Sequence, residues 1–405
     1  MRKVRIGIIG CGVISRTYLR DLTGIYGKWL EVAAVANRTL ETARRVAREF
    51  GISRACSIEE LLADPTIEIV VNLTVPAAHT EINKRILQAG KHVFCEKPLA
   101  LSLAEAQEVL EMARKKQLLV CCAPELFLNS GLQTARKALD QGKIGCPILA
   151  TANMVKCGPE INHPNPDFFY QPGGGPLLDM GPYYLSALVA LLGPIQRVSC
   201  LSTRPTNLRR IYSQPRRGEE IPVSVDTTYL GLLQFRSGLV ANLTMSFDVW
   251  RSDLPCLQIY GSEGSLRLPD PNLTRGSVSL YRKENLTEYS REDSAGHSTK
   301  QPQEQIRQKR YSGNQHREEQ QELYEELPPV YPLLKPEPEE YMRGLGVVDM
   351  AFALVEGRSP RAGADLSYHV TEVMDALICS AADQLPRDIH SSCQRPTPVQ
   401  CGEFK

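Results

Sequence analysis

Three separated groups of residues in this chain offer the side chains and backbone features that chemistry needs. Near the start, Gly10-Cys11-Gly12-Val13-Ile14-Ser15 forms a glycine turn that can hold a dinucleotide phosphate. Further along, Glu96-Lys97-Pro98 supplies a lysine, and Asp179-Met180-Gly181-Pro182-Tyr183 supplies an acid and a phenol. A phosphate turn combined with groups that can move a proton predicts a nicotinamide-dependent oxidoreductase acting on an alcohol or a carbonyl.

The glycine turn gains its meaning from its neighbours, because it directly follows an apolar run predicted to be a strand and opens a predicted helix. Gly10 and Gly12 allow a tight turn and a close approach of pyrophosphate to the helix amino terminus, where free N–H groups favour anions. Val13 and Ile14 begin that helix beside the phosphate. The third position of the pattern is Ser15 in place of glycine, which allows slightly looser helix–sheet contact. The alternative is a plain strand–helix turn.

Asn37-Arg38 ends the second predicted strand. Enzymes selective for NAD usually place an acid about 20 residues after the glycines to hold the ribose 2′-hydroxyl, whereas an arginine accommodates a 2′-phosphate. Asn37 carries no charge to repel that phosphate, and Arg38 can pair with it. We therefore favour NADP as the cofactor, with NAD possible. The alternative interpretation of Arg38 is a solvated surface charge.

Gly173-Gly174-Gly175 precedes the acid and the phenol and lets the chain pass close to a ligand. A helix that begins near Leu177 would place Asp179 and Tyr183 one turn apart on the same face. An unperturbed phenol has a pKa of about 10, so Tyr183 needs help to act as a base near neutrality. A nearby Lys97 ammonium would favour the phenolate. Whether Tyr183 or Lys97 moves the proton is left open.

A loop rich in proline and polar residues occupies positions 162–171, between these groups. Loops held by rigid elements often carry binding residues. His163 and Gln171 are our candidates for substrate contacts in this loop, against the equally weighted alternative that both are ordinary surface residues.

The first 123 residues alternate short apolar runs with helical segments. Strands are predicted at residues 4–9, 30–36, 67–73, 92–95 and 118–122, with helices between them, such as 40–50 and 103–115. Two helices open with a capping box, Ser57 with Glu60 and Ser102 with Glu105. Apolar strands that alternate with helices indicate a parallel sheet covered on both faces. We expect a doubly wound, dinucleotide-binding domain over residues 1–123 of an α/β protein.

From residue 124 onward the pattern changes. After a helix at 131–141 and an apolar helix at 177–192, apolar runs at 223–235, 239–247 and 254–259 are separated only by turn residues. Hairpin spacing without intervening helices indicates a large, mainly antiparallel sheet. Further helices are predicted up to Leu354 and over 365–384. We expect an α+β domain over residues 124–405 that binds substrate and mediates oligomerisation.

The segment from about residue 282 to 336 differs from both halves. It is dense in Glu, Gln, Arg and Lys and holds few large apolar residues. Such a composition cannot bury enough surface to offset the entropy of ordering. We expect a charged excursion from the second domain, exposed or partly helical.

The composition excludes several classes of function. The 47 Lys and Arg residues nearly balance the 46 Asp and Glu residues, so no overall charge would attract nucleic acid or an anionic membrane. No apolar run approaches the ~20 residues that a membrane-spanning helix needs. The amino terminus leads straight into a predicted strand, without the pattern of a signal peptide. We expect a cytoplasmic protein that binds neither nucleic acid nor membrane.

The 12 cysteines show no Cys-x-x-Cys spacing, and Cys95, Cys121 and Cys122 lie inside apolar runs. Such thiols behave as small hydrophobic residues in a reducing compartment. We therefore expect free thiols, with neither a disulfide framework nor a metal site.

The order and context of these groups resemble the glucose-fructose oxidoreductase / inositol dehydrogenase / rhizopine catabolism (Gfo/Idh/MocA) family, over nearly the whole chain except the charged excursion. The resemblance implies a Rossmann domain followed by the α+β domain. It also implies that Thr74, Pro76 and His79 line the cofactor groove, with His79 as a contact and not a catalyst. The resemblance further implies that Glu96 lies beside the cofactor.

The resemblance identifies Glu96-Lys97-Pro98 as the family's signature tripeptide, often with a cis bond before the proline. Lys97 would touch both the substrate hydroxyl and the nicotinamide ribose. Most members have Asp-x-Gly-x-His where this chain has Asp179 and Tyr183, the tyrosine variant of the glucose-fructose oxidoreductase and dihydrodiol dehydrogenase branches. Tyr184 is expected to point elsewhere, into the core.

The expected activity is reversible hydride transfer between nicotinamide and a secondary alcohol or ketone of a sugar, glycoside or cyclitol. Lys97, Asp179 and Tyr183 would be catalytic and would contact the substrate. The alternatives are a dihydrodiol or carbonyl reductase and a non-catalytic, cofactor-binding regulator on the same fold. A homodimer or homotetramer is expected, because antiparallel sheets of this type often pair face to face.

Overall fold

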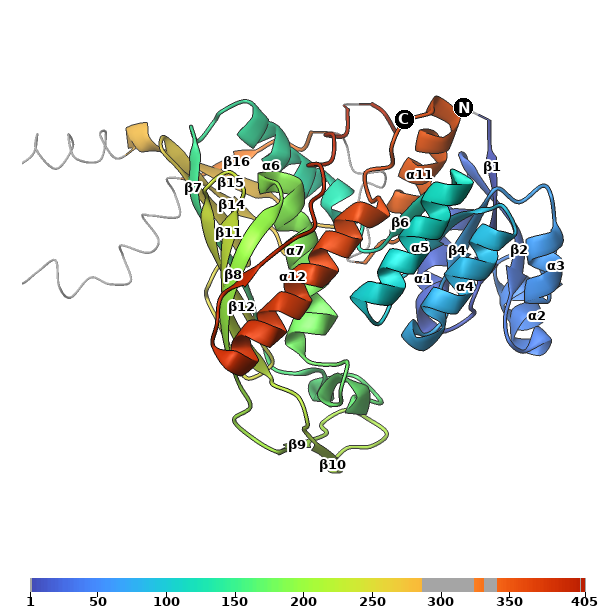
Figure 1. The fold of residues 1–405 in the computed structure, drawn as a ribbon, viewed down its shortest axis with the longest axis horizontal. Helices are drawn as coiled ribbons and strands as arrows, with labels where there is room; N and C mark the ends of the chain where they lie inside the picture. The colour runs from blue at the N-terminus through green and yellow to red at the C-terminus, as the bar shows by residue number, and fades with distance from the viewer. Residues whose placement is uncertain (1, 286–323, 331–340, 401, 405) are drawn as a thin grey trace, which may run out of the picture.

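The computed structural model describes residues 2–285, 324–330, 341–400 and 402–404. Within them, a six-stranded sheet and a nine-stranded sheet stand on either side of the long helices α7 (Pro176–Leu192) and α12 (Ala364–Asp383), as Figure 1 shows. A small two-stranded sheet, β9 (Leu208–Arg210) with β10 (Glu220–Pro222), projects from the nine-stranded side. The predicted combination of a parallel sheet with a larger, mainly antiparallel one is confirmed.

The six-stranded sheet is entirely parallel, with the strand order β3-β2-β1-β4-β5-β6. Its strands are β1 (Val4–Ile9), β2 (Leu30–Ala36), β3 (Ala55–Cys56), β4 (Ile69–Asn72), β5 (His92–Cys95) and β6 (Val120–Cys122). Its helices are α1 (Val13–Thr23), α2 (Leu40–Glu49), α3 (Ile58–Ala63), α4 (Pro76–Gln88) and α5 (Leu103–Lys116). The order in which successive strands are added to the sheet reverses between β1 and β4, and ligands of such sheets bind in the crevice at that point.

Only one of the two predicted capping boxes is complete. Ser57 and Glu60 exchange both hydrogen bonds at the start of α3. At α5, the Ser102 hydroxyl accepts from the Glu105 amide, but the Glu105 carboxylate accepts from the amide of Leu101 and not from that of Ser102. That carboxylate also accepts from the Thr80 hydroxyl of α4, so a contact between helices displaces the local one.

The nine-stranded sheet has the order β16-β15-β14-β13-β7-β12-β11-β8-β17, and every neighbouring pair is antiparallel except β7 with β12. Its strands are β7 (Pro147–Val155), β8 (Ile195–Thr203), β11 (Thr228–Phe235), β12 (Val240–Ser246), β13 (Leu257–Gly261), β14 (Gly264–Leu268), β15 (Val278–Arg282), β16 (Glu325–Leu327) and β17 (Arg387–Asp388). The run predicted at 223–235 is therefore shorter, because its first residues form the approach from β10. Strand β16 lies within the predicted charged excursion, most of which, 286–323 and 331–336, is outside the described residues.

The remaining helical elements are α6 (Ser130–Asp140), α11 (Leu345–Glu356) and the 3₁₀ turns η1 (Leu126–Leu128), η2 (Pro159–Ile161) and η3 (Asp167–Tyr170). Helix α12 contacts β8 of the large sheet and β6 of the parallel sheet. Late residues also extend the edge of β6, where the Cys122 amide donates to the Ala362 carbonyl at 3.1 Å. The expected division at residues 123 and 124 stays a prediction.

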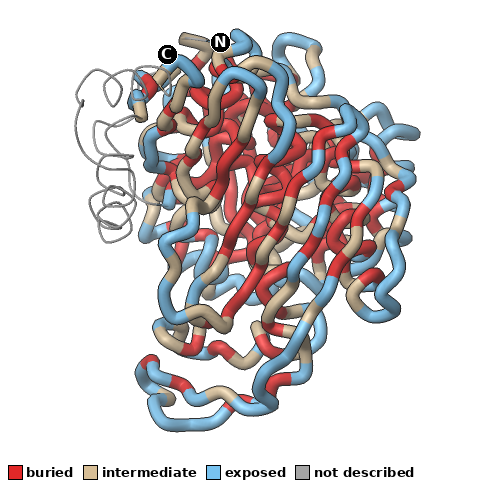
Figure 2. Tube along the Cα trace, turned by 90° about the vertical axis from the view of Figure 1, so that its left-hand side faces the viewer, coloured by how far each residue is buried: buried red, intermediate tan, exposed pale blue. Residues whose placement is uncertain are grey.

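Among the described residues, no helix covers the outer face of the large sheet, and its strands alternate between exposed and buried residues, as Figure 2 shows. On β11, Leu230 and Leu232 are exposed, while Gly231, Leu233 and Phe235 face the core. Leu230 pairs with the exposed Leu201 of β8. This face is therefore largely apolar yet open.

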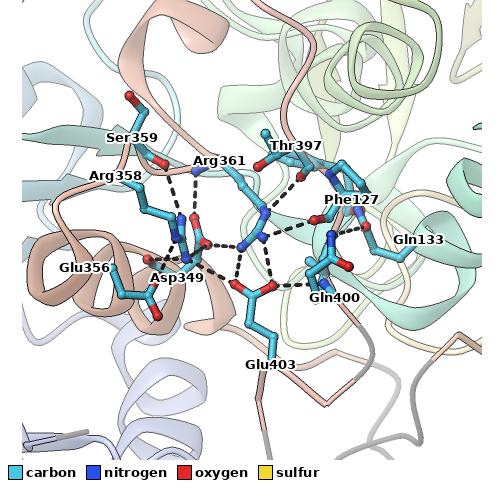
Figure 3. A network of polar contacts seen from close by, with 12 residues as sticks. Phe127, Gln133, Asp349, Glu356, Arg358, Ser359, Arg361, Thr397, Gln400 and Glu403 are labelled. Atoms are coloured by element: carbon cyan, nitrogen blue, oxygen red, sulfur yellow. Dashed lines mark hydrogen bonds and ion pairs between the residues drawn. The ribbon is translucent and has the colours of Figure 1, made fainter.

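The carboxyl-terminal tail is fixed by a buried charge network, drawn in Figure 3. Arg361 donates to the buried Asp349 of α11 at 2.6 Å and to Glu403 at 2.8 Å, and Arg358 contacts the same two carboxylates at 2.8 and 3.2 Å. Next to this network, the ring of Phe404 packs against Trp29, the residue before β2, with 6.4 Å between ring centroids. The end of the chain thus covers part of the first sheet's core.

All eleven cysteines of the described residues are free, and seven are buried: Cys11, Cys56, Cys95, Cys121, Cys122, Cys200 and Cys393. This confirms the expected free thiols for the part of the chain that the structure describes. In the same residues, no helix has the length and apolar character to cross a membrane.

Candidate active site

The glycine turn between β1 and α1 leaves an open helix amino terminus. Gly10 has a φ of +103°, and a Cβ there would lie 2.5 Å from the Leu73 carbonyl group, so only glycine fits. Gly12 precedes α1, which has no side-chain cap, and a Cβ on Gly12 would meet nothing within 4 Å. Free N–H groups beside empty space fit the pyrophosphate of a dinucleotide.

Short hydrogen bonds hold this turn against β2. The Gly10 amide donates to the Ala36 carbonyl at 2.9 Å, and the Cys11 amide donates to the Asn37 side-chain oxygen at 3.2 Å. Ser15, at the third glycine position, is buried and donates its hydroxyl to the Gly12 carbonyl at 2.6 Å. Asn37 therefore positions the turn through its side chain.

Apolar and cationic side chains lie exposed around the turn. Val13 is 89% exposed at the start of α1, and Ile14 beside it is exposed too, which is unusual for large apolar side chains unless a ligand covers them. Arg38 is exposed and has no ion-pair partner among the described residues, so its guanidinium is available to an anion.

Thr74 and Pro76 lie at the end of β4, on the same edge as the glycine turn. The Thr74 hydroxyl donates to the Asn72 side-chain oxygen at 2.7 Å, and Pro76 is the exposed first residue of α4. His79 is only 1% exposed. Its two ring nitrogens face the carbonyl oxygens of Pro98 at 2.6 Å and Thr74 at 3.0 Å. His79 thus lies beneath the groove and ties its two loops together.

Glu96 is buried, as His79 is, and it is more buried than Lys97. Its carboxylate accepts from the Tyr18 hydroxyl at 2.9 Å and from the Lys97 amide at 2.8 Å. These bonds fix the backbone from which the Lys97 side chain extends. The bond between Lys97 and Pro98 is cis, as the family resemblance implies.

Lys97 reaches across to helix α7, which belongs to the other half of the molecule. Its ammonium donates to the Asp179 carbonyl at 2.8 Å and to the Asp179 carboxylate at 3.1 Å. Burial lowers the pKa of Lys97, but the charge of Asp179 and the hydrogen bond to its carboxylate act against this, and the pKa lies above its ordinary value. Lys97 is therefore an ammonium ion at neutral pH.

Tyr183 follows Asp179 by one turn of α7 and lies beside the same ammonium group. Its ring centroid is 5.6 Å from the Lys97 nitrogen and 5.8 Å from the guanidinium carbon of Arg343. Burial raises the pKa of Tyr183, and the two cations lower it without compensating. Lys97 favours the phenolate, as expected, but burial outweighs it, so the pKa of Tyr183 lies above its ordinary value and the phenol keeps its proton at neutral pH.

Arg343 and Glu125 belong to this cluster, although neither was predicted as a site residue. Arg343 is buried, and its backbone amide donates a hydrogen bond to the Asp21 carboxylate at 2.9 Å. Glu125 accepts from the Gly344 amide at 2.8 Å, has a second carboxylate oxygen that is buried without a partner, and has a pKa raised by burial. The one signal in the sequence was a charged residue directly before the apolar helix α11.

His163 and Gln171 are not brought into contact with Lys97, Asp179 or Tyr183 by any of their hydrogen bonds. The His163 ring lies against Phe168 and Phe169, with centroid distances of 5.5 and 5.3 Å. The Gln171 amide donates to the Pro222 carbonyl at 2.9 Å. Their contact with substrate stays a prediction.

Tyr184 is buried and donates to Asp270 at 3.2 Å, on the other side of α7 from Tyr183. Its expected place in the core is confirmed. Two neighbouring tyrosines of one helix therefore differ in whether they belong to the site.

Comparison with known proteins gives two matches to family models. Residues 4–123 match an oxidoreductase family with an NAD-binding Rossmann fold, and residues 132–267 match the GFO/IDH/MocA C-terminal domain. These segments contain the glycine turn, Lys97, Asp179 and Tyr183.

Individual proteins are similar as well. The mouse trans-1,2-dihydrobenzene-1,2-diol dehydrogenase is 30% identical over 65% of this chain and 74% of its own length. A 1,5-anhydro-D-fructose reductase from Ensifer adhaerens is 28% identical over 65% and 74%. A solved levoglucosan dehydrogenase, in complex with NADH and levoglucosan, has the same fold, with a TM-score of 0.74 at 19% identity over 96% of this chain and 100% of that one.

Proposed function

This chain belongs to the Gfo/Idh/MocA family of NAD-binding oxidoreductases, and from that premise we propose which reaction its site performs. The site transfers a hydride between a nicotinamide cofactor and a secondary alcohol or ketone of a sugar, glycoside or cyclitol. The observation that supports this most directly is the convergence of Lys97, Asp179 and Tyr183 at the ligand-binding edge of the parallel sheet.

The residues of the crevice fit a nicotinamide dinucleotide. The amides at the start of α1 hold the pyrophosphate beside Gly12, and Val13, Thr74 and Pro76 line the groove. When bound, the nicotinamide ring supplies or accepts the hydride. His79 and Glu96 act from below, by fixing the two loops that form the groove.

The proton is moved by Tyr183 and Lys97 together. In the reducing direction, the protonated Tyr183 phenol gives its proton to the substrate oxygen, while the Lys97 ammonium stabilises the developing negative charge. Asp179 holds Lys97 in place and orients the substrate hydroxyl. General acid–base assistance of this kind contributes ~10²–10⁴-fold to the rate.

NADP is the cofactor that the end of β2 favours. Arg38 is exposed without an ion pair in the described residues, and Asn37 presents no carboxylate to a 2′-phosphate. NAD remains compatible with the same groove, because nothing in it blocks a 2′-hydroxyl.

A second candidate substrate class is the trans-dihydrodiol of an aromatic ring. The similarity of 30% to the mouse dihydrodiol dehydrogenase favours it, as does the tyrosine at position 183. Both classes present a secondary carbinol to the same acid–base pair, so they differ only in the pocket walls.

The protein forms a homodimer, or a homotetramer built from such dimers, through the outer face of the large sheet. The exposed Leu201, Leu230, Leu232 and Val240 alternate there with uncharged Ser199 and Asn242. An exposed apolar patch of this kind, with the charged Arg197 toward its edge, is typical of protein–protein interfaces.

Initial rates of NADPH and NADH oxidation with keto-sugars and inososes, and of NADP reduction with trans-dihydrodiols, test the proposed reaction. We expect turnover of at least one polyol-derived ketone that depends on Lys97. Tight cofactor binding with no turnover of any of these substrates would contradict the proposal.

A further inference from the structure

We propose that Cys95 and Cys122 form an oxidation site, in which a hydroperoxide converts the two thiols into a disulfide directly beneath the candidate active site. No part of the proposed hydride transfer uses either sulfur. Only the effect of this oxidation on turnover rests on the proposed function, because the sulfur chemistry depends on the positions of the two cysteines alone.

The sheet places the two cysteines opposite each other. Cys95 ends β5, Cys122 ends β6, and the two residues are direct partners in the parallel register. Neighbouring strands lie ~4.8 Å apart, inside the range of Cα separations that a disulfide spans. Partners in register project from the same face, and both belong to the same core cluster. Both sulfur atoms also lie near one acceptor, the Glu96 carbonyl, at 3.1 and 3.8 Å.

A cation stands next to this pair. Both ring nitrogens of His79 face carbonyl oxygens, at 2.6 and 3.0 Å, and two such contacts need a proton on each nitrogen. Burial disfavours the charged ring, but Cys95 and the two carbonyls outweigh it and raise the pKa of His79 to about 9.

The buried imidazolium makes Cys95 the reactive member of the pair. Burial opposes ionisation of Cys95, but the hydrogen bond from Cys122 and the charge of His79 outweigh it and lower its pKa to about 6. Burial instead raises the pKa of Cys122. A thiolate that lies beside a thiol and near a cation is the arrangement in which one cysteine attacks the oxidant and the second resolves the sulfenic acid.

A small oxidant has space beside the pair. A cavity of about 20 Å³ is lined by Lys97, Pro98, Cys122, Ser186 and other residues of α7 and α12. That volume holds a molecule the size of water. Lys97 and Cys122 both line this cavity and Cys95 does not, so a small polar oxidant enters from the side of the substrate and passes Cys122 to reach the Cys95 thiolate, its partner in register.

The chemistry balances with one hydroperoxide. The Cys95 thiolate attacks one oxygen, the O–O bond breaks, and Cys95 becomes a sulfenic acid while the departing oxygen leaves as an alcohol or water after taking a proton. The Cys122 sulfur then attacks the Cys95 sulfur, the S–S bond forms and the S–O bond breaks, and water leaves with the Cys122 proton. Two thiols and one hydroperoxide give a disulfide, an alcohol or water, and one further water.

The disulfide would alter the site above it. In the reduced protein, both thiols contact the Glu96 carbonyl, and Glu96 fixes the Lys97 backbone. Joining the sulfur atoms removes these contacts with the Glu96 carbonyl, so the backbone that carries Lys97 shifts relative to Asp179. We expect oxidation to lower turnover reversibly.

Peptide mapping tests the proposal. The full-length protein is treated with hydrogen peroxide, free thiols are alkylated after denaturation, and the digest is analysed by mass spectrometry without reduction. We expect a peptide pair joined through Cys95 and Cys122, formed roughly tenfold faster than oxidation of the exposed Cys146, because the thiolate is the reacting form. Full alkylation of Cys95 and Cys122 while Cys146 is oxidised would overturn the proposal.

Cys121 provides the matched control, because it lies in the same strand but belongs to the core cluster of the opposite face. Cys121→Ala should keep the joined peptide pair, whereas Cys122→Ala should lose it and leave a sulfenic acid on Cys95 that dimedone traps. If peroxide lowers turnover, dithiothreitol should restore it in the wild type. A protein that forms the disulfide yet reduces no ketone would retain this inference and remove the proposed function.

Discussion

Lys97 and Asp179 form an ion pair that joins the parallel sheet to helix α7, with the ammonium nitrogen 2.8 Å from the Asp179 carbonyl and 3.1 Å from its carboxylate. The two residues come from separate halves of the chain, so the pair exists only when both halves are folded and docked. Its position beside the Tyr183 ring makes the junction of the two sheets the centre of the site.

Replacing Lys97 with methionine should preserve cofactor binding and remove most of the turnover. The substitution keeps the apolar stem but deletes the charge that stabilises the substrate oxygen, so we expect kcat to fall by ~10²–10⁴-fold. Fluorescence titration with NADPH and steady-state rates measure the two effects. Lys115→Met, on the exposed end of α5, is the control and should behave as wild type. A near-normal rate in Lys97→Met would remove this residue from the mechanism.

Tyr183→Phe and Tyr184→Phe should differ sharply. The first deletes the phenol that donates the proton, and we expect a loss of ~10²–10⁴-fold in kcat at unchanged stability. The second deletes a hydrogen bond to Asp270 in the core, which should lower the free energy of unfolding by about 1 kcal/mol and leave kcat unchanged. Urea unfolding and initial rates, measured on both variants, separate the two roles. Equal effects on kcat would place Tyr183 outside the chemistry.

Arg38→Ala should weaken NADPH more than NADH. Loss of a charge-assisted hydrogen bond costs about 1.5–3 kcal/mol, which is roughly a 10- to 100-fold rise in Kd. The Kd for NADH should change little, because no 2′-phosphate is present. Arg48→Ala, on the exposed side of α2, controls for a general loss of positive charge. Wild-type protein that binds NADH as tightly as NADPH would rule out the proposed preference.

His369 should make the protein less stable in mild acid. The ring is buried in α12, its Nε2 accepts from the Ile195 amide at 3.0 Å, and burial lowers its pKa to about 4 despite the nearby Glu372. The unfolded chain takes up a proton near pH 6.5 and the folded one does not. The contribution is therefore complete above that pH and is lost as the pH falls toward about 4, by roughly 3 kcal/mol at most.

Urea unfolding of wild type and His369→Gln between pH 4 and 7 measures this contribution as a difference. The difference in the free energy of unfolding should grow with pH up to about 6.5 and then level off. The exposed His390→Gln variant should show no such slope. A difference that does not change with pH would mean that His369 has the same pKa in the folded and unfolded protein, and would contradict its lowered pKa.

Leu232→Asp should separate the proposed dimer. Leu232 is 65% exposed at the middle of β11, and a charge buried between two facing sheets is unfavourable. Sedimentation velocity should show a monomer for this variant and a dimer or tetramer for wild type. Leu208→Asp, in the small β9–β10 sheet, should keep the wild-type assembly. A monomeric wild type would dismiss this face as an interface.

The parallel sheet could be predicted because its strands are continuous apolar runs and because apolar residues recur at helical spacing in the helices between them. Strand β3 was missed, since two residues carry no periodicity. The half-formed capping box at Ser102 also has a physical cause, because Thr80 of another helix competes for the Glu105 carboxylate. Local patterns cannot contain such distant contacts.

In the candidate site too, local sequence patterns predict some features, whereas others depend on contacts between distant residues. Gly10, Lys97 and Asp179 were found because each follows directly from a strand end or a helix start. The pKa of Tyr183 could not be predicted in this way. It depends on how deeply the ring is buried and on Arg343, which reaches the site from a remote segment. Types and spacing identify the groups, and packing sets their protonation.

The packing of Phe404 on Trp29 has a consequence for how the protein is made. On the ribosome, the first sheet emerges long before Phe404, which packs on Trp29, and Glu403, which accepts from Arg358 and Arg361, have been synthesised. Until these two residues emerge, the nascent chain carries an indole that lacks its Phe404 contact and two arginines that lack one of their carboxylate partners. Products of premature termination keep both defects permanently, and these defects mark them for chaperones and proteases.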